Sequence, residues 1–210
     1  MKELLLTGMA TLGLVAVVFG QGAVSVDNDL STHGVAVNRP GNWYSGAFGM
    51  EVWMLNSSTV PANLASIYEV WGAGVVAYNN MIADDFRLEA TYSGRTISDG
   101  MFDFGVLRMP DVSPAGSSVV LGLATWNSSA PSWSAMLSGW YATTAAAVIV
   151  FVNPTAIPPA APPSLTGWDA LGRDLVFYVP EPSSLALAGL GAALLLVARR
   201  RPRRPSGETD

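Results

Sequence analysis

Residues 86–92 read Phe-Arg-Leu-Glu-Ala-Thr-Tyr, and apolar and polar side chains alternate along them. A period of two residues is typical of a β-strand with one buried face. The Ser93-Gly94 pair that follows predicts the end of this strand. Short apolar segments of the same kind, separated by Gly, Pro, Asn and Ser, continue on both sides from Val24 to Tyr178. This pattern indicates a domain built from strands.

Further strands are predicted on the same grounds. Residues Ser118–Trp126 are apolar on both faces, so we expect this strand at the centre of a sheet that is covered on both sides. Within Met101–Met109, an alternating pattern would place Phe102, Phe104 and Val106 on one face. The remaining predicted strands are Phe48–Leu55, Ala145–Val152 and Asp174–Val179.

Strands that recur about every 10 to 20 residues predict an all-β fold. We expect a single antiparallel β-sandwich or jelly-roll-like domain over residues 23–179. Pro61 suits the first turn of a helix that would run to about Val70. The proline-rich Asn153–Pro163 segment predicts an extended loop or strap.

The composition excludes several kinds of chemistry. The chain has 210 residues, of which 50% are hydrophobic and 13% are charged, and it has no Cys. A disulfide framework, a thiolate metal site and a Cys nucleophile are therefore excluded. Lys2 is the only lysine, so the domain lacks the residue for Schiff-base or P-loop chemistry. Residues 24–180 hold 5 Arg and 12 Asp or Glu, a net charge of −7, which disfavours a nucleic-acid partner.

The N-terminus has the pattern of a secretory signal peptide. Lys2 precedes the uncharged run Leu4–Phe19, and small residues follow at Gly20, Gly22 and Ala23. We expect a signal peptide over residues 1–22, cut after Gly22 or Ala23. The alternative is an N-terminal anchor that is retained.

The C-terminus has the pattern of a short membrane anchor. The run Pro182–Ala198 is uncharged and would rise about 25 Å as a helix, close to the roughly 30 Å of a bilayer core. We expect a transmembrane helix over residues 183–198. Because arginines beside a span stay in the cytoplasm, the cluster that follows predicts a cytoplasmic stop signal and an exported domain. The cluster consists of Arg199, Arg200, Arg201, Arg203 and Arg204.

Directly before this run stand Pro180, Glu181 and Pro182. A Pro-Glu-Pro tripeptide, a short apolar run and a terminal Arg cluster together resemble the PEP-CTERM sorting signal of Gram-negative bacteria, over residues 180–204. The resemblance implies that the tail holds the exported protein transiently in the inner membrane. An exosortase would then process it for delivery to the cell surface or the extracellular matrix. Residues 205–210 add a polar tail beyond the signal. The alternative is a plain single-pass anchor.

Aromatic residues in predicted loops are candidates for binding carbohydrate. Trp126 and Trp133 flank a Ser- and Pro-containing segment, and Trp43 and Tyr44 form a second pair. Indole faces stack on sugar rings while neighbouring Asn and Ser can bond the ring edges. The alternative is that Trp126 and Trp133 fill the core of a domain that has no disulfides.

Acidic residues and the single histidine give weaker indications. Asp27-Asn28-Asp29 and Asp84-Asp85 could contribute to calcium binding, but the first lacks the EF-hand pattern, and solvated turns are the preferred interpretation. We therefore predict no metal site and no cofactor. Glu51 with Asp103 is one carboxylate pair that could in principle serve a glycosidase. His33 is interpreted as a loop residue.

Taken together, the sequence favours a non-enzymatic exported protein with a structural or adhesive role. We expect it at the surface or in the biofilm matrix, associated with exopolysaccharide. One alternative is a carbohydrate-binding module, and a second is a secreted hydrolase that uses two carboxylates.

Overall fold

The computed structural model describes residues 21–65, 73–97, 99–127, 130–137, 146–177 and 182–199. The chain divides into two compact units, Met1–Tyr178 and Val179–Asp210. The first unit holds the β domain. The second contains helix α5 and is treated by itself below.

The domain is organised by a four-stranded antiparallel sheet in the order β4-β3-β6-β7. Its strands are β3 (Ala47–Leu55), β4 (Arg87–Arg95), β6 (Ser118–Asn127) and β7 (Ala146–Pro154). Strand β6 pairs with β3 on one side and with β7 on the other. Buried side chains point from β6 to both faces, so the prediction of a doubly covered central strand is confirmed.

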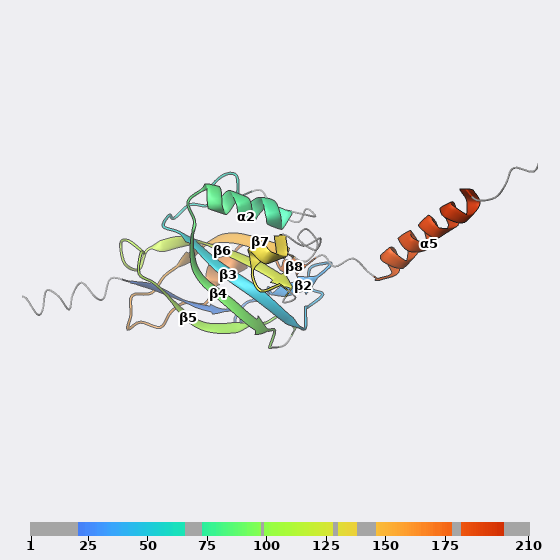
Figure 1. Ribbon diagram of the computed structural model, residues 1–210. Coiled ribbons are helices and arrows are strands. Elements are labelled where there is room, and N and C mark those ends of the chain that lie inside the picture. Colours follow the sequence, from blue (N-terminus) through green and yellow to red (C-terminus); the bar gives the residue numbers. More distant parts are fainter. Residues whose placement is uncertain are drawn as a thin grey trace, which may run out of the picture. The chain divides into compact units, whose positions relative to one another are not determined.

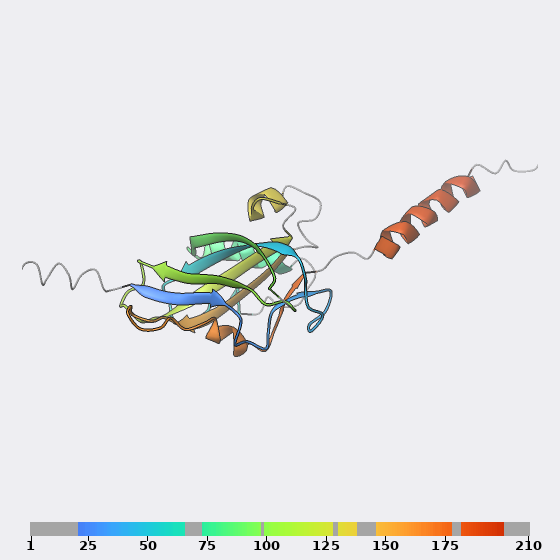
Figure 2. The ribbon, with the colours of Figure 1, turned by 90° about the horizontal axis from the view of Figure 1, so that it is seen from below.

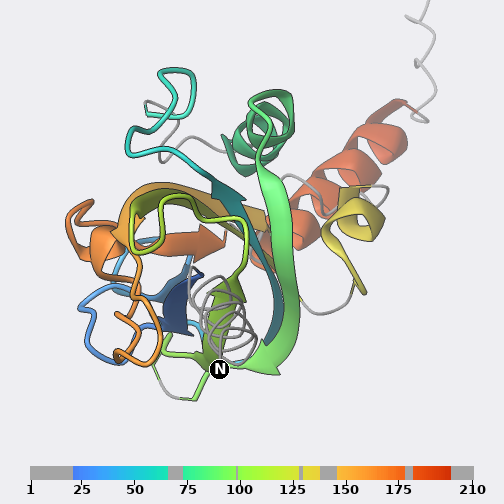
Figure 3. The same ribbon diagram turned by 90° about the vertical axis from the view of Figure 1, so that its left-hand side faces the viewer.

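A second β layer covers one face of this sheet (Figures 1 and 3). It contains an antiparallel pair, β1 (Gly22–Asp27) with β5 (Asp103–Met109), which Figure 2 shows from below. It also contains a parallel pair, β2 (Val35–Val37) with β8 (Leu175–Phe177). The short helix α4 (Thr166–Asp169) packs on the same side through the fully buried Trp168. The main hydrophobic core lies between the two layers.

Helices cover the other face of the four-stranded sheet. They are α2 (Ala73–Ala83) and α3 (Trp133–Leu137), and α2 lies above the sheet in Figure 1. A second hydrophobic cluster fills the space beneath them. The prediction of an all-β antiparallel domain is therefore confirmed only in part. The domain is mostly β, but helices flank the sheet, and the β2–β8 pair is parallel where antiparallel pairing was expected.

Two predicted strands differ in detail. Strand β4 continues through Ser93-Gly94 to Arg95, because the missing side chain of Gly94 leaves room for the Phe104 ring. In β5, Gly105 has a φ of 77° and breaks the alternation. As a result Leu107 is buried and Val106 is 55% exposed, so the predicted shared face of β5 is wrong at Val106.

The predicted helix from Pro61 to Val70 is also wrong where the structure describes it. The amides of Leu64 and Ala65 both donate to the carbonyl of Pro61, which forms a turn, and residues 66–72 lie outside the described residues. The helix runs instead over Ala73–Ala83 and contains Gly74. A Cβ at Gly74 would lie 3.0 Å from the Ala146 carbonyl oxygen, so close packing on β7 favours the glycine there.

Candidate functional site

The C-terminal unit contains a single described helix, α5 (Pro182–Arg199), 18 residues long. Pro182 is its first residue, a position that suits proline because the fixed φ is helical and no intrahelical N–H is needed. Arg199 is its last residue and is exposed. Pro180 and Glu181, like Arg200, Arg201, Arg203 and Arg204, lie outside the described residues.

Helix α5 covers the residues predicted as a transmembrane helix. Within the part of the chain that the structure describes, no helix combines the length and the apolar composition that a membrane crossing requires. The transmembrane prediction for residues 183–198 is therefore not confirmed. The predicted signal peptide lies almost entirely within residues 1–20, outside the described part.

The candidate carbohydrate-contact residues fall into two groups. Trp126 and Trp133 are both 0% exposed and pack in the cluster beneath α2 and α3. The Trp126 Nε1 donates to the carbonyl of Ala130 at 2.8 Å. A buried indole has no free face for a sugar ring, so these two residues belong to the core and not to a surface site. Trp43 is 37% exposed, whereas the neighbouring Tyr44 is partly buried and donates its hydroxyl to the Ala47 carbonyl.

Glu51 is a buried carboxylate that the fold itself uses. Its Oε2 accepts hydrogen bonds from Trp53 Nε1 and from the Tyr78 hydroxyl, both at 3.0 Å. Burial, together with the neighbouring Glu51 carboxylate, raises the pKa of Tyr78 well above its ordinary value. Tyr78 also stacks on Trp133 with ring centroids 4.4 Å apart. The sequence pattern gave no signal for this aromatic group, because its members come from β3, α2 and α3.

The proposed carboxylate pair does not form. Glu51 faces α2, as its bond to Tyr78 shows, whereas Asp103 belongs to β5 in the opposite layer and accepts from the Gly105 amide at 2.8 Å. The four-stranded sheet lies between the two carboxylates. Glu51 with Asp103 therefore does not provide the opposed acids that a glycosidase needs.

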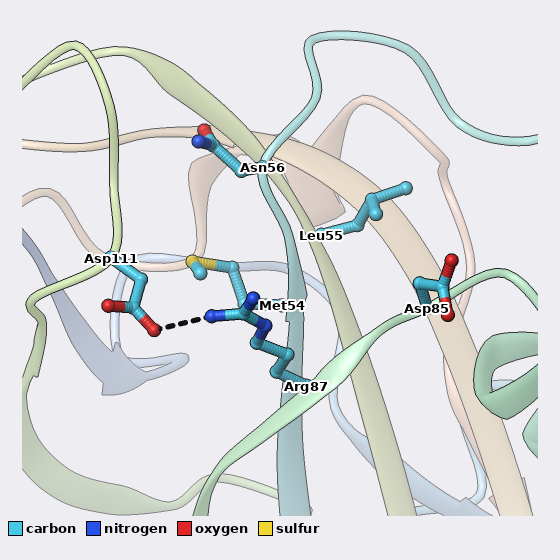
Figure 4. A pocket seen from close by; sticks show the side chains of 6 residues that line it. All are labelled: Met54, Leu55, Asn56, Asp85, Arg87 and Asp111. Carbon is cyan, nitrogen blue, oxygen red and sulfur yellow. Dashed lines mark hydrogen bonds and ion pairs between the residues drawn. The ribbon is translucent and has the colours of Figure 1, made fainter.

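A surface cavity of about 200 Å³ opens at one end of β3 and β4 (Figure 4). Its ion pair joins Arg87 and Asp111 at 2.8 Å, and both side chains are more than half exposed. Burial and the charge of Asp111 raise the pKa of the nearby Glu89, and Arg87 opposes this. Asp85 also lines the cavity. Among the described residues, no group of three or more His, Cys, Asp or Glu could hold a metal ion.

His33 has a carboxylate partner far along the chain. Its Nδ1 lies 3.2 Å from Oδ1 of Asp174, whose side chain is 5% exposed. Asp174 also accepts from the amides of Gly34 and Gly41, so it fixes the loop around His33. The Ser31 hydroxyl accepts from the backbone amide of His33 at 2.9 Å, not from its ring. This arrangement is structural and differs from a hydrolase triad, in which the imidazole contacts the serine.

The comparison with family models identifies the tail. The PEP-CTERM protein-sorting motif matches residues 179–204. Proteins that carry this motif are exported and sorted through their C-terminus by an exosortase in Gram-negative bacteria. The chain carries the motif that its Pro180-Glu181-Pro182 tripeptide predicted, and this motif indicates an exported protein that an exosortase sorts. No curated protein and no solved structure matches the chain.

Proposed function

We propose that this protein is a non-enzymatic component of the cell surface or extracellular matrix, with a structural or adhesive role associated with exopolysaccharide. The observation that carries the proposal is the sorting motif at residues 179–204, placed directly after a compact β domain. The motif directs where the domain is delivered. The domain itself is the part that acts there.

The use of polar groups within the domain supports a structural role. Glu51 accepts from two aromatic donors, and Asp174 contacts His33 and two backbone amides. Asn28 and Asn153 are fully buried and bond to backbone groups. Polar groups committed in this way hold loops and layers together. They are poorly placed to act on a substrate.

The proposal includes a transient stage at the inner membrane. Two segments support this stage. The uncharged run Pro182–Ala198 is suited to contact with lipid, and the arginines from Arg199 to Arg204 are suited to the cytoplasmic side of the membrane. An exosortase would then cut near Pro180-Glu181-Pro182. Two prolines disfavour a helix at this point, which would leave an extended segment for the enzyme to bind.

The test replaces Pro180, Glu181 and Pro182 together by alanine in the native host. We expect processing and surface delivery to fall at least tenfold, with the unprocessed chain accumulating in the membrane fraction. Intact mass and cell fractionation measure both effects. The matched control is the double variant Pro205→Ala/Glu208→Ala, which removes the same residue types just outside the motif and should behave as the wild type.

Two outcomes would contradict the proposal. Unchanged processing and surface delivery of the triple variant would show that the tripeptide does not direct sorting. Recovery of the wild-type chain at full length in the cytosol would show that it is not exported at all.

Of the aromatic candidates for exopolysaccharide contact, Trp43 and Tyr44 remain.

A further inference from the structure

A small cavity of about 20 Å³ lies where the end of β1 meets the segment that leads into α4. Its lining is rich in oxygen atoms and contains no basic side chain. The residues that line it are Asp27, Asn28, Leu30, Ser31, Ser164, Leu165, Thr166 and Asp169. A volume of this size holds one water molecule or one small ion.

Asp27 is the unusual residue in this cavity. It is the last residue of β1 and is only 8% exposed, although the sequence predicted a solvated turn here. Its Oδ1 is buried and has no hydrogen-bond partner. Burying a carboxylate oxygen without a partner is costly, so native structures satisfy such atoms with water, a donor or a cation.

Among the described residues, three buried side-chain atoms have no hydrogen-bond partner, and they are Asp27 Oδ1, Asp84 Oδ2 and Trp133 Nε1. The buried residues Asn28, Glu51, Thr125, Asn153 and Thr155 each make at least one side-chain hydrogen bond within the chain. Of the three unpartnered atoms, only Asp27 Oδ1 belongs to a residue that lines this cavity. A carboxylate oxygen without a partner, in a small cavity lined by other oxygens, favours a cation as the ligand.

The walls of the cavity are fixed on both sides. On the β1 side, the Asn28 side chain donates to the carbonyl of His33 at 2.9 Å and accepts from the Phe102 amide at 2.6 Å. On the α4 side, Asn153 donates to the carbonyl of Ser164 and accepts from the Gly167 amide. The Ser31 hydroxyl spans the two sides by donating to Asp169. A ligand would therefore meet a preformed site.

We propose that this cavity binds a calcium ion between the carboxylates of Asp27 and Asp169, with neutral oxygens from Ser31, Ser164 and Thr166. Ca²⁺ is a hard cation that takes carboxylate, hydroxyl, carbonyl and water oxygens. Two carboxylates on a domain with net negative charge supply the attraction. Only two acids are present, so the dissociation constant should be about 10⁻⁴ to 10⁻³ M, as in extracellular modules.

The ion would link parts of the chain that are far apart in sequence. Asp27 ends the first strand of the domain, and Asp169 ends α4, close to the last strand. Calcium would therefore stabilise the folded domain in a medium that supplies it. This role is independent of whether the exosortase proposal holds.

The test measures binding to the purified full-length chain in detergent. Isothermal titration calorimetry gives the affinity, and thermal unfolding gives the stabilisation. With a dissociation constant of about 1 mM, 10 mM CaCl₂ should raise Tm by about 3 to 6 °C. MgCl₂ at the same concentration and NaCl at the same ionic strength should raise it by less than about 1 °C, because Mg²⁺ gives up its water reluctantly.

Variants locate the site. Asp27→Asn and Asp169→Asn should each weaken calcium binding at least tenfold, while the control Asp29→Asn changes an exposed neighbouring acid and should bind as the wild type. In calcium-free buffer, Asp27→Asn should not lower Tm, because it removes an unpaired buried charge. If Asp27→Asn does not fold, the test rests on Asp169→Asn, because Asp169 is exposed and its substitution should leave the fold intact.

Several results would overturn the proposal. They are the absence of a calcium-specific rise in Tm, an equal response to Mg²⁺, and unaltered calcium binding in Asp169→Asn. Loss of binding in Asp29→Asn to the same extent would also overturn it, because the effect would then come from the acidic surface in general. A failed sorting test would leave each of these results unchanged.

Discussion

The two faces of the four-stranded sheet are covered in different ways. Strand β3 contributes to both faces, with Met50 and Val52 pointing toward β1 and β5 and with Glu51 and Trp53 on the side of α2. The first face packs against strands, and its core consists mainly of aliphatic side chains and phenyl rings. The second packs against helices and combines a row of four contacting aromatic rings with a buried carboxylate, and the row consists of Trp53, Tyr78, Trp133 and Trp126.

This difference shows how a β domain without cysteine closes its second face. The side toward β1 uses edge contacts between phenyl rings, such as Phe48 with Phe102 at 5.8 Å. The side toward α2 uses indoles, and Trp126 and Trp133 are as fully buried as the phenylalanines opposite. Both faces are core. The aromatic residues of the helix face therefore stabilise the fold and do not form a surface for ligands.

The largest expected effect comes from removing an indole of the helix face. Trp126→Ala should lower the free energy of unfolding by about 3 to 5 kcal/mol, because it leaves a large cavity. Phe48→Ala on the strand face is the matched variant and should cost a similar amount. Urea unfolding followed by circular dichroism measures both. A loss below about 1 kcal/mol for Trp126→Ala alone would show that the helix face is not core.

A smaller effect is expected where glycines of the sheet lie under side chains of the helix face. A Cβ at Gly49 would come within 2.3 Å of the Trp126 ring, and one at Gly122 within 2.2 Å of the Met81 sulfur. Gly49→Ala should cost about 1 to 3 kcal/mol, since the indole cannot move aside in a packed core. Gly122→Ala should cost less because methionine is flexible. Urea unfolding measures both losses of stability. A larger loss for Gly122→Ala than for Gly49→Ala would contradict this prediction.

The smallest expected effect depends on pH. The pKa of Tyr78 is raised in the folded state, so folding loses stability as the pH rises above 10, where the unfolded tyrosine ionises first. The wild type should lose about 1 kcal/mol by pH 11 from this residue. Tyr78→Phe should lack that share. Tyr92→Phe should keep the share of Tyr78 and lack only the contribution of Tyr92, whose pKa burial also raises. Equal losses in wild type and Tyr78→Phe would remove Tyr78 as the cause.

Local patterns were sufficient for part of this molecule. The alternation over residues 86–92 predicted a half-buried strand, and the apolar run at Ser118–Trp126 predicted a central strand. Both strands are present, as β4 and β6, although Leu88 on the predicted apolar face of β4 is 48% exposed. The sorting motif was predicted from a tripeptide and its neighbours, since an enzyme that binds a linear segment needs no tertiary structure.

Long-range contacts account for what local patterns missed. Strand β8 lies within the predicted Asp174–Val179 strand, but the three-residue strand β2 is too short to show a period and was not predicted. Nothing local indicates that Val35 pairs with Leu175. The depth of Asp27 depends on α4, and the burial of Trp133 depends on Tyr78. The positive φ of Gly105 places Val106 on the exposed face of β5 instead of the predicted buried face. None of these follows from a window of neighbouring residues.

The parallel pair of β2 and β8 has a mechanical consequence. Strand β8 ends at Phe177, two residues before Val179, where the unit that carries the sorting motif begins. A pull on the tail therefore reaches the folded domain first at β8. Its bonds to β2, together with the Asn38 amide that donates to the Phe177 carbonyl, would bear that load in shear. In shear, the β2–β8 hydrogen bonds share the load at the same time instead of breaking one after another. We therefore expect this pair to resist a pull on the tail.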